Sequence, residues 1–189
     1  MAVTCTGAIL AGGQSRRMGA PKEGVLLADG RPMVEHVCAS LAAVCPRVVV
    51  AGECRGYPDL TVPRIADLRP GLGPLAGLEA LLSSGLDAAY LIAACDQPFV
   101  TPELLRRLLR GDAEQLRCFR EAGGTGFHPF PCYLPASWLP RVQEALDQGR
   151  LAVRTLFGQD HPNWPLVSAA EVAQLRSVNR PADLEVRAA

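Results

Sequence analysis

The sequence contains a single lysine, Lys22, although 19 of its 189 residues are basic, so arginine supplies every other basic side chain. Acidic and basic residues are equal in number, which argues against a partner bound by charge alone, such as nucleic acid or an anionic membrane. No apolar run is long enough to cross a bilayer, and no basic segment precedes the first apolar run as in a signal peptide. We therefore expect a soluble, cytoplasmic protein.

The seven cysteines lack the spacing of a metal site or a disulfide framework. Their number is odd, no pair is spaced as C-x-x-C, and the three histidines are isolated from one another. We interpret the cysteines as small buried apolar side chains. Apolar residues make up 49% of the chain and charged residues 20%, which is enough to form a core and too little charge for disorder. The length and the lack of a linker predict one domain, residues 1–189.

Short apolar runs alternate with segments of helical periodicity, a pattern typical of a mostly parallel sheet covered by helices. We predict strands at 3–10, 47–51, 60–66 and 88–95 and helices at 32–44, 74–82 and 101–109. The 88–95 run is the most continuously apolar, as expected for a central strand buried on both faces. Beyond residue 112 the pattern loosens. We expect strands at 116–119 and 131–134, helices at 138–148 and 152–157, short segments at 171–175 and 177–184, and irregular chain at 159–166.

The segment after the first predicted strand reads Leu10-Ala11-Gly12-Gly13-Gln14-Ser15-Arg16-Arg17-Met18-Gly19, and Lys22 follows closely. Two adjacent glycines let the backbone turn sharply and present N–H donors without obstruction by a Cβ. A row of such donors binds anions, and the nearby arginines and lysine add positive charge. Neither G-x-x-x-x-G-K-[ST] nor G-x-G-x-x-G fits the segment. The order of its residues nevertheless favours a phosphate-binding loop over an ordinary solvated turn.

A second glycine-containing segment, 71–77, opens the predicted helix at 74–82. Its glycines would allow a flat ligand to approach the backbone closely. Asp67, at the end of the predicted 60–66 strand, could accept hydrogen bonds from a base or a ribose. A plain turn before a helix is the alternative interpretation.

Asp96 follows the 88–95 strand directly. A carboxylate at the C-terminal end of a central parallel strand lies where open α/β sheets bind ligands. Next to phosphates, the natural role of such a carboxylate is to bind Mg²⁺, which accepts one or two carboxylates together with phosphate oxygens. Alternatively, Asp96 could only end the strand with an Asx-turn.

Taken together, these segments resemble the molybdenum cofactor guanylyltransferases, which are MobA-type nucleotidyltransferases. The matching segments run in order along the chain: 10–19 with Lys22, 30–32, 73–77, 95–98 and 178–184. The second glycine of the opening motif, Gly13, favours the guanylyl branch, because the cytidylyl relatives more often read L-A-A-G.

The resemblance implies a three-layer α/β sandwich with a mostly parallel, Rossmann-like central sheet, similar to the nucleotide-diphospho-sugar transferases. It implies transfer of GMP from GTP to molybdopterin with release of pyrophosphate, with Mg²⁺ as cofactor and Asp96 as its ligand. Arg17 and Lys22 would stabilise the leaving pyrophosphate, and Asn179 with Arg150 or Arg154 would recognise the pterin. The implied nucleotide-binding residues are Leu10, Ala11, Gly12, Gly13, Ser15, Lys22, Asp67, Gly73, Pro74 and Gly77. Transient contacts with cofactor biosynthesis proteins and acceptor enzymes are also implied.

Three positions depart from the family pattern. Ala51 stands where the family often has an asparagine that contacts guanine, Pro21 where an aspartate often precedes the lysine, and Ser177 in place of the first of two asparagines. The alternatives are the same chemistry with CTP, a sugar or polyol phosphate as acceptor, or a non-catalytic GTP-binding adaptor. Asp96 and Lys22 favour an enzyme over an adaptor, because a protein that only binds GTP needs no metal at the α-phosphate.

Overall fold

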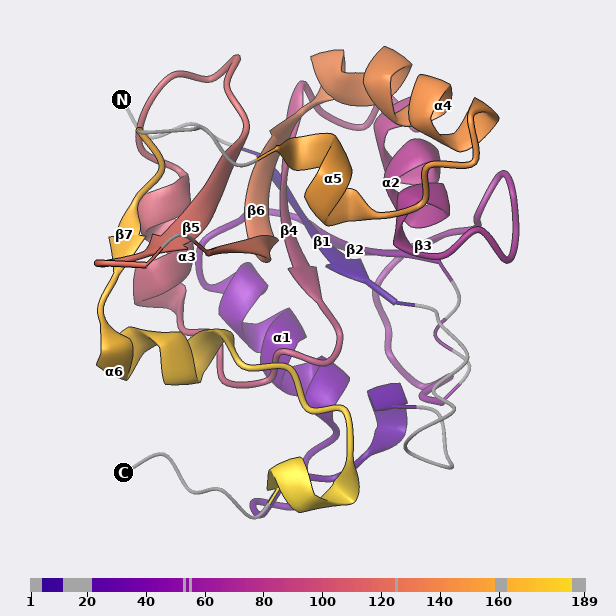
Figure 1. The fold of residues 1–189 in the computed structure, drawn as a ribbon. Helices are drawn as coiled ribbons and strands as arrows, with labels where there is room; N and C mark the ends of the chain where they lie inside the picture. The colour runs from indigo at the N-terminus through magenta and orange to yellow at the C-terminus, as the bar shows by residue number, and fades with distance from the viewer. Residues whose placement is uncertain are drawn as a thin grey trace.

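The computed structural model of the protein describes residues 5–11, 22–52, 54, 56–124, 126–158 and 163–184. One seven-stranded sheet forms the centre, in the order β3-β2-β1-β4-β6-β5-β7 (Figure 1). Among the described strands only β6 runs against the others, since it pairs antiparallel with both β4 and β5. The strands are β1 (Thr6–Leu10), β2 (Val48–Ala51), β3 (Arg64–Ile65), β4 (Ala89–Ala94), β5 (Arg117–Glu121), β6 (Phe127–Pro135) and β7 (Leu166–Val167).

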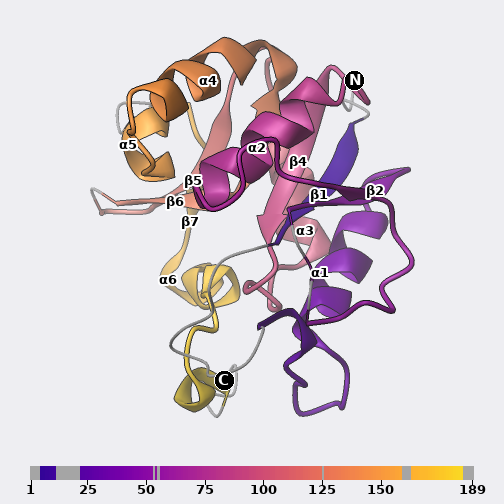
Figure 2. The same ribbon diagram turned by 90° about the vertical axis from the view of Figure 1, so that its right-hand side faces the viewer.

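Helices cover both faces of the sheet and confirm the three-layer α/β arrangement. One face is covered by α1 (Met33–Ala42) and α3 (Pro102–Leu108). The other face is covered by α2 (Pro74–Ser83), α4 (Leu139–Asp147) and α5 (Val153–Phe157), as the side view shows (Figure 2). The remaining helical segments are α6 (Ala169–Val172), η1 (Lys22–Gly24), η2 (Ala136–Trp138), η3 (Ala173–Leu175) and η4 (Pro181–Leu184).

The central strands are apolar throughout because both of their faces are buried. In β1, Ile9 packs into the core under α1 and α3, whereas Ala8 packs into the core under α2 and α4. In β4, Leu91 and Ile92 divide between the two cores in the same way. A strand covered on both sides has no polar face, which explains why the sequence shows continuous apolar runs here.

The structure differs from the sequence-based expectation mainly in the second half of the chain. The β5–β6 hairpin is longer than the predicted strands at 116–119 and 131–134, and β7 begins at the last residue of the 159–166 segment expected to be irregular. Only two residues of β7 pair with β5, and two residues are too few to show a period. The predicted 60–66 strand is reduced to Arg64–Ile65. Residues 3 and 4 of the first predicted strand lie outside the described residues.

None of the helices in the described part of the chain is long and apolar enough to cross a membrane.

Candidate active site

The candidate site lies at the carboxyl ends of β1 and β4, the point where the strand order changes direction. From β1 the chain builds outward through β2 and β3 on one side, whereas β4 is added on the other side. Such a switch point leaves a crevice in which open α/β sheets bind ligands. The strand ends are tied together at this edge, since Cys95 N donates to Leu10 O (3.0 Å) and Ala11 N donates to Ala51 O (2.9 Å).

Three side chains that are distant in the sequence meet at this edge. Lys22 Nζ lies 3.2 Å from Asp96 Oδ2 and 2.5 Å from Asn179 Oδ1. The Lys22 and Asp96 side chains are each 18% exposed, so the pair is accessible to a ligand yet partly shielded from water. Lys22 begins η1, Asp96 follows β4, and Asn179 belongs to the segment after η3. The structure thus brings together three of the residues that the sequence analysis selected.

The C-terminal segment is fastened across the end of β4 by backbone and side-chain hydrogen bonds. Val178 N donates to the carbonyl oxygen of Asp96 at 2.8 Å. The buried side chain of Gln97 donates to Phe130 O and to Leu175 O, both at 2.9 Å. Gln97 therefore joins β4, β6 and the segment that carries Asn179, a role that the sequence analysis did not assign to it.

A turn at residues 179–183 orients Asn179. The carboxylate of Asp183 accepts hydrogen bonds from Asn179 N (2.7 Å) and Arg180 N (2.8 Å). These backbone amides stabilise the charged form and lower the pKa of Asp183 below its ordinary value. The closing V-N-R-P-A-D-L motif is thus a compact turn that presents the Asn179 side chain to Lys22.

Asp67 lies on the other side of β1, where three chain segments approach closely. A Cβ on Gly77 of α2 would lie 2.6 Å from Leu10 Cδ1 and 3.7 Å from Asp67 Oδ1. Gly52 follows β2 with φ +92°, and a Cβ there would overlap the carbonyl oxygen of Ala11. Glycine at 52 and 77 therefore allows α2 and the β2 end to pack directly against the β1 end. Gly52 was not among the residues selected from the sequence, although it directly follows a predicted β-branched strand.

An ion-pair cluster holds the β3–α2 loop, which contains Asp67. Arg69 bridges Glu79 of α2 at 3.1 Å and Asp147 at the end of α4 at 2.5 Å. The Glu79 side chain is only 2% exposed, so its charge depends on the guanidinium for compensation. Gly73, at φ +72°, is the N-cap of α2, and Pro74 is the first residue of the helix. Gly73 and Pro74 thus set the direction in which α2 leaves this loop.

Several predicted site residues lie outside the described residues. Gly12, Gly13, Ser15 and Arg17 belong to the undescribed 12–21 segment, so their roles in phosphate binding and catalysis stay predictions. Leu10 and Ala11 lead into this segment, and Lys22 is the first residue after it.

The residues present at the site fit one magnesium ion that arrives with phosphates. Asp96 offers a partly exposed carboxylate, and no group of three or more histidine, cysteine, aspartate or glutamate side chains within the described ranges could hold a metal alone. Magnesium is commonly bound by one or two protein carboxylates, with phosphate oxygens and water completing its octahedron. A single carboxylate beside a lysine matches that donor set better than it matches a resident metal centre.

The two arginines considered for the pterin site lie in different places. Arg154, in α5, stacks on the ring of Phe127 at 4.7 Å from its centroid. Phe127 is the first residue of β6, and because β6 is antiparallel to β4, this end of β6 lies on the same edge as Asp96. Arg150 instead lies 3.9 Å from Glu144 of α4.

The cysteines are free thiols, and six of the seven are buried, as expected. Cys95 is next to Asp96, but burial raises its pKa, so it remains a neutral thiol. It packs in the core below the site.

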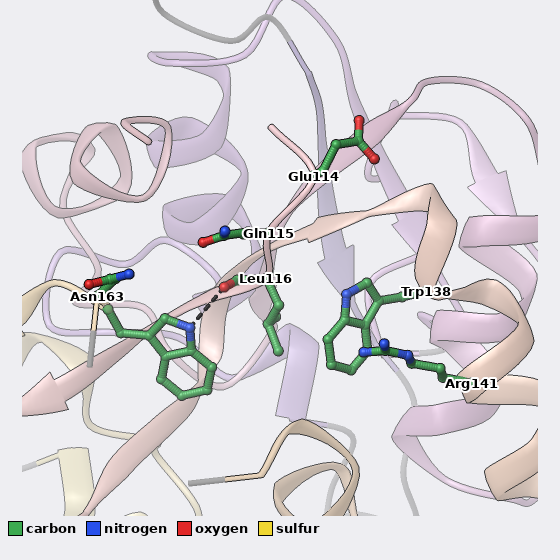
Figure 3. A pocket seen from close by; sticks show the side chains of 7 residues that line it. Glu114, Gln115, Leu116, Trp138, Arg141 and Asn163 are labelled. Atoms are coloured by element: carbon green, nitrogen blue, oxygen red, sulfur yellow. Dashed lines mark hydrogen bonds between the residues drawn. The ribbon is translucent and has the colours of Figure 1, made fainter. Parts of the chain in front are cut away.

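A pocket lies between β5, the end of β6 and α4, at the opposite edge of the sheet (Figure 3). It adjoins Leu116, before β5, and Trp138, after β6, and the register places these segments next to the start of β4. Trp164 donates from Nε1 to Leu116 O at 2.8 Å, and Arg141 lies over the Trp138 ring at 4.7 Å. Its aromatic side chains thus already have partners, and the pocket does not include the Lys22–Asp96–Asn179 group.

A family model described as "MobA-like NTP transferase domain" matches residues 7–163. Among curated proteins, a molybdenum cofactor guanylyltransferase from Desulfosudis oleivorans is 30% identical over 156 residues, which cover 82% of this chain and 77% of that protein. A probable molybdenum cofactor guanylyltransferase from Methanothermobacter thermautotrophicus is 32% identical over 200 residues, covering 95% and 96%.

The fold also matches solved structures. One is the crystal structure of molybdopterin-guanine dinucleotide biosynthesis protein A from Archaeoglobus fulgidus, with a TM-score of 0.72 and 25% identity over 95% of both chains. This similarity and that to the Methanothermobacter protein extend over 95% of the chain, whereas the family model ends at residue 163.

Proposed function

The chain belongs to the MobA-like NTP transferase family, and on this basis we propose that it transfers GMP from GTP to molybdopterin. The products are the molybdopterin guanine dinucleotide cofactor and pyrophosphate. Curated relatives of 30% and 32% identity with the name molybdenum cofactor guanylyltransferase support this assignment. The observed contacts that best support the assignment are those of Lys22 with Asp96 and with Asn179 at the carboxyl end of β4.

The reaction needs positioned charge more than proton transfer. The attacking group is the terminal phosphate of molybdopterin, which is already anionic, so no protein general base is required. The new bond forms between this phosphate oxygen and the α-phosphorus of GTP, and the bond to the pyrophosphate oxygen breaks in line. Catalysis of such a step depends on orientation and on neutralisation of the charge on the phosphate oxygens. Lys22 supplies a cation that is already held at the site by two acceptors.

Asp96 is the proposed ligand for Mg²⁺. When bound, the ion neutralises charge on the phosphate oxygens during transfer. The backbone of Asp96 is fixed in position, because its carbonyl oxygen accepts a hydrogen bond from Val178 N. The role of Arg17, which we place on the departing pyrophosphate, is a hypothesis based on its position in the 10–19 motif.

The base is proposed to bind on the Asp67 side of β1. Gly52 and Gly77 let three segments pack closely there, and Arg69 fixes the loop that carries Asp67. A carboxylate can accept hydrogen bonds from the N–H groups of guanine. On the acceptor side, the position of Arg154 on the Asp96 edge favours it over Arg150 as the pterin contact.

A nucleotide-selectivity assay tests the proposal. Pyrophosphate release is measured with Mg²⁺, molybdopterin and each of GTP, CTP, ATP and UTP. We expect turnover with GTP to exceed that with CTP by at least about tenfold, equivalent to about 1.4 kcal/mol. Preferred turnover with CTP would favour the cytidylyltransferase alternative. Tight binding of GTP without pyrophosphate release from any acceptor, sugar phosphates included, would favour the adaptor.

Asp96→Asn tests the site itself. The variant keeps the side-chain volume but removes the charged metal ligand, so we expect turnover to fall by about 10² or more. Asp59→Asn is the matched control, because Asp59 is exposed on the β2–β3 connection. Wild-type turnover of Asp96→Asn at saturating Mg²⁺ would contradict the metal assignment. Transient contacts with proteins that deliver molybdopterin or receive the product are a further part of the proposal.

A further inference from the structure

The Lys22 ammonium is held by two different kinds of acceptor. Asp96 provides a carboxylate oxygen at 3.2 Å and Asn179 provides an amide oxygen at 2.5 Å. An ammonium carries three N–H donors and no acceptor, so these two contacts fix two of its three donor directions. A lysine side chain is flexible because it has four rotatable bonds. The two contacts limit rotation about these bonds and therefore limit the positions that the ammonium can occupy.

Because the ammonium can only donate, the amide oxygen of Asn179 must be the atom that faces it. The Nδ2 donors of the same amide therefore face a different direction. The backbone of Asn179 is held by Asp183, and the neighbouring Val178 is bonded to Asp96 O. The Asn179 end of the contact is thus anchored by hydrogen bonds within the protein.

A neutral amide suits this position. A second carboxylate would also hold the ammonium, but it would place another negative charge beside the phosphates of a nucleotide. An apolar side chain would remove this contact and leave the contact with Asp96, and Asp96 is the residue proposed to bind the metal. Asparagine offers an acceptor without either cost.

We propose that Asn179 is a positioning residue for Lys22, so that the C-terminal segment takes part in nucleotide binding as well as in recognition of the acceptor. Its Oδ1 fixes the ammonium, and its Nδ2 donors remain for the second substrate. The inference rests on the proposed function for the identity of the nucleotide. The contact between Asn179 and Lys22 is present in the structure and does not depend on the proposed function.

The single lysine makes this contact measurable in the nucleotide-free protein. An amine-acylating reagent can modify only Lys22 and the N-terminal amine, and peptide mapping by mass spectrometry separates the two. We expect Asn179→Ala to accelerate modification of Lys22 about tenfold, because a charge-assisted hydrogen bond that restrains the ammonium is lost. Asn179→Asp keeps an acceptor and adds a negative charge that stabilises the ammonium, so its rate should be no faster than that of wild type.

Asn163→Ala is the matched control, since Asn163 is the only other asparagine in the sequence and is exposed at the opposite edge of the sheet. It should leave Lys22 modification unchanged, and the N-terminal amine serves as an internal standard. An unchanged Lys22 rate in Asn179→Ala would overturn the proposal. So would an Asn179→Asp rate as fast as that of Asn179→Ala, because the amide oxygen would then not be the atom that matters.

Calorimetry with GTP and Mg²⁺, without acceptor, provides the second readout. We expect Asn179→Ala to weaken GTP binding about tenfold, which corresponds to about 1.4 kcal/mol. In a Lys22→Ala background the same substitution should have almost no effect, because the partner of the amide is gone. Equal effects in both backgrounds would contradict the proposal. If the wild type bound no GTP, the proposed function would fail, whereas the modification rates would still decide the role of Asn179.

Discussion

Replacing Lys22 by arginine keeps the charge and changes its shape, and the structure lets the effect be worked out. The ammonium is a compact charge that donates to Asp96 Oδ2 at 3.2 Å and to Asn179 Oδ1 at 2.5 Å. A guanidinium is planar and forked, and its two terminal nitrogens lie one bond further from Cα than the lysine nitrogen does. It cannot occupy the same point between the two acceptors without moving one of them or turning its plane away from the phosphates.

The expected loss follows from this displacement. Misplacing a group by about 1 Å can cost about 10²-fold in rate, and the conserved charge recovers part of that loss. We therefore expect Lys22→Arg to lower kcat by about 10- to 100-fold, or about 1.4–2.7 kcal/mol of transition-state stabilisation. The assay is steady-state pyrophosphate release with GTP, Mg²⁺ and molybdopterin. Thermal unfolding of the same preparation provides the control for folding.

A second measurement separates binding from chemistry. If the ammonium acts mainly in the transition state, kcat falls while the affinity for GTP, measured by calorimetry, changes less. Turnover of Lys22→Arg within about twofold of wild type would refute the argument. It would mean that the site requires only positive charge, and that lysine at this position has no geometric role.

Three further predictions concern the frame of the site. Gly52→Ala should lower the free energy of unfolding, measured in urea, by about 1–3 kcal/mol, because a Cβ at φ +92° meets backbone. Gly123→Ala, also at positive φ but without a neighbour within 4 Å, should lower it less. Equal losses of unfolding free energy in the two variants would contradict the close approach at Gly52. Arg69→Ala should lower the free energy of unfolding by about 1–3 kcal/mol, because it leaves Glu79 buried without its guanidinium partner. Adding Glu79→Gln should restore most of the lost unfolding free energy. No restoration would show that the ion pair is not the cause of the loss. Two backbone amides lower the pKa of Asp183 below 3.8, so its stabilisation is full above that value and is lost as pH falls through the folded-state pKa. The difference in unfolding midpoint between wild type and Asp183→Asn should therefore shrink as pH falls below 3.8, and a constant difference would exclude this linkage.

The parts of the fold that sequence could predict are those with a strong local signal. The run that became β4 is apolar because both faces are buried, and α3 begins at Pro102, after Thr101, whose side chain caps the helix by accepting from Leu104 N. By contrast, β7 is two residues long and exists because the end of β5 offers it an edge. No local pattern encodes such a strand, since its stability comes from a partner that is distant in the sequence.

The site divides in the same way. Asp96 could be selected because a carboxylate directly after a central strand is a local signal with a known geometric meaning. The pairing of Lys22 with Asn179 could not be predicted, because 157 positions separate them and only the path of the C-terminal segment brings them together. Gln97 and Arg69 were missed for a related reason: a buried amide or an ion-pair bridge is recognisable only from the groups that surround it.

The sheet and the active site do not form at the same stage of folding, because Asn179 reaches the site only through the last segment of the chain. The last strand of the sheet, β7, is complete at Val167, and both cores have received most of their side chains by then. The segment that follows adds Gln97–Leu175, Val178–Asp96 and Asn179–Lys22, and each of these contacts closes a long loop of chain. Long loop closures form late, because their entropy must be offset by structure already present. A nascent chain that has built its sheet would therefore still lack the Asn179–Lys22 contact, and a shortened variant that stops after β7 should fold its sheet and keep the Lys22–Asp96 contact without that of Asn179.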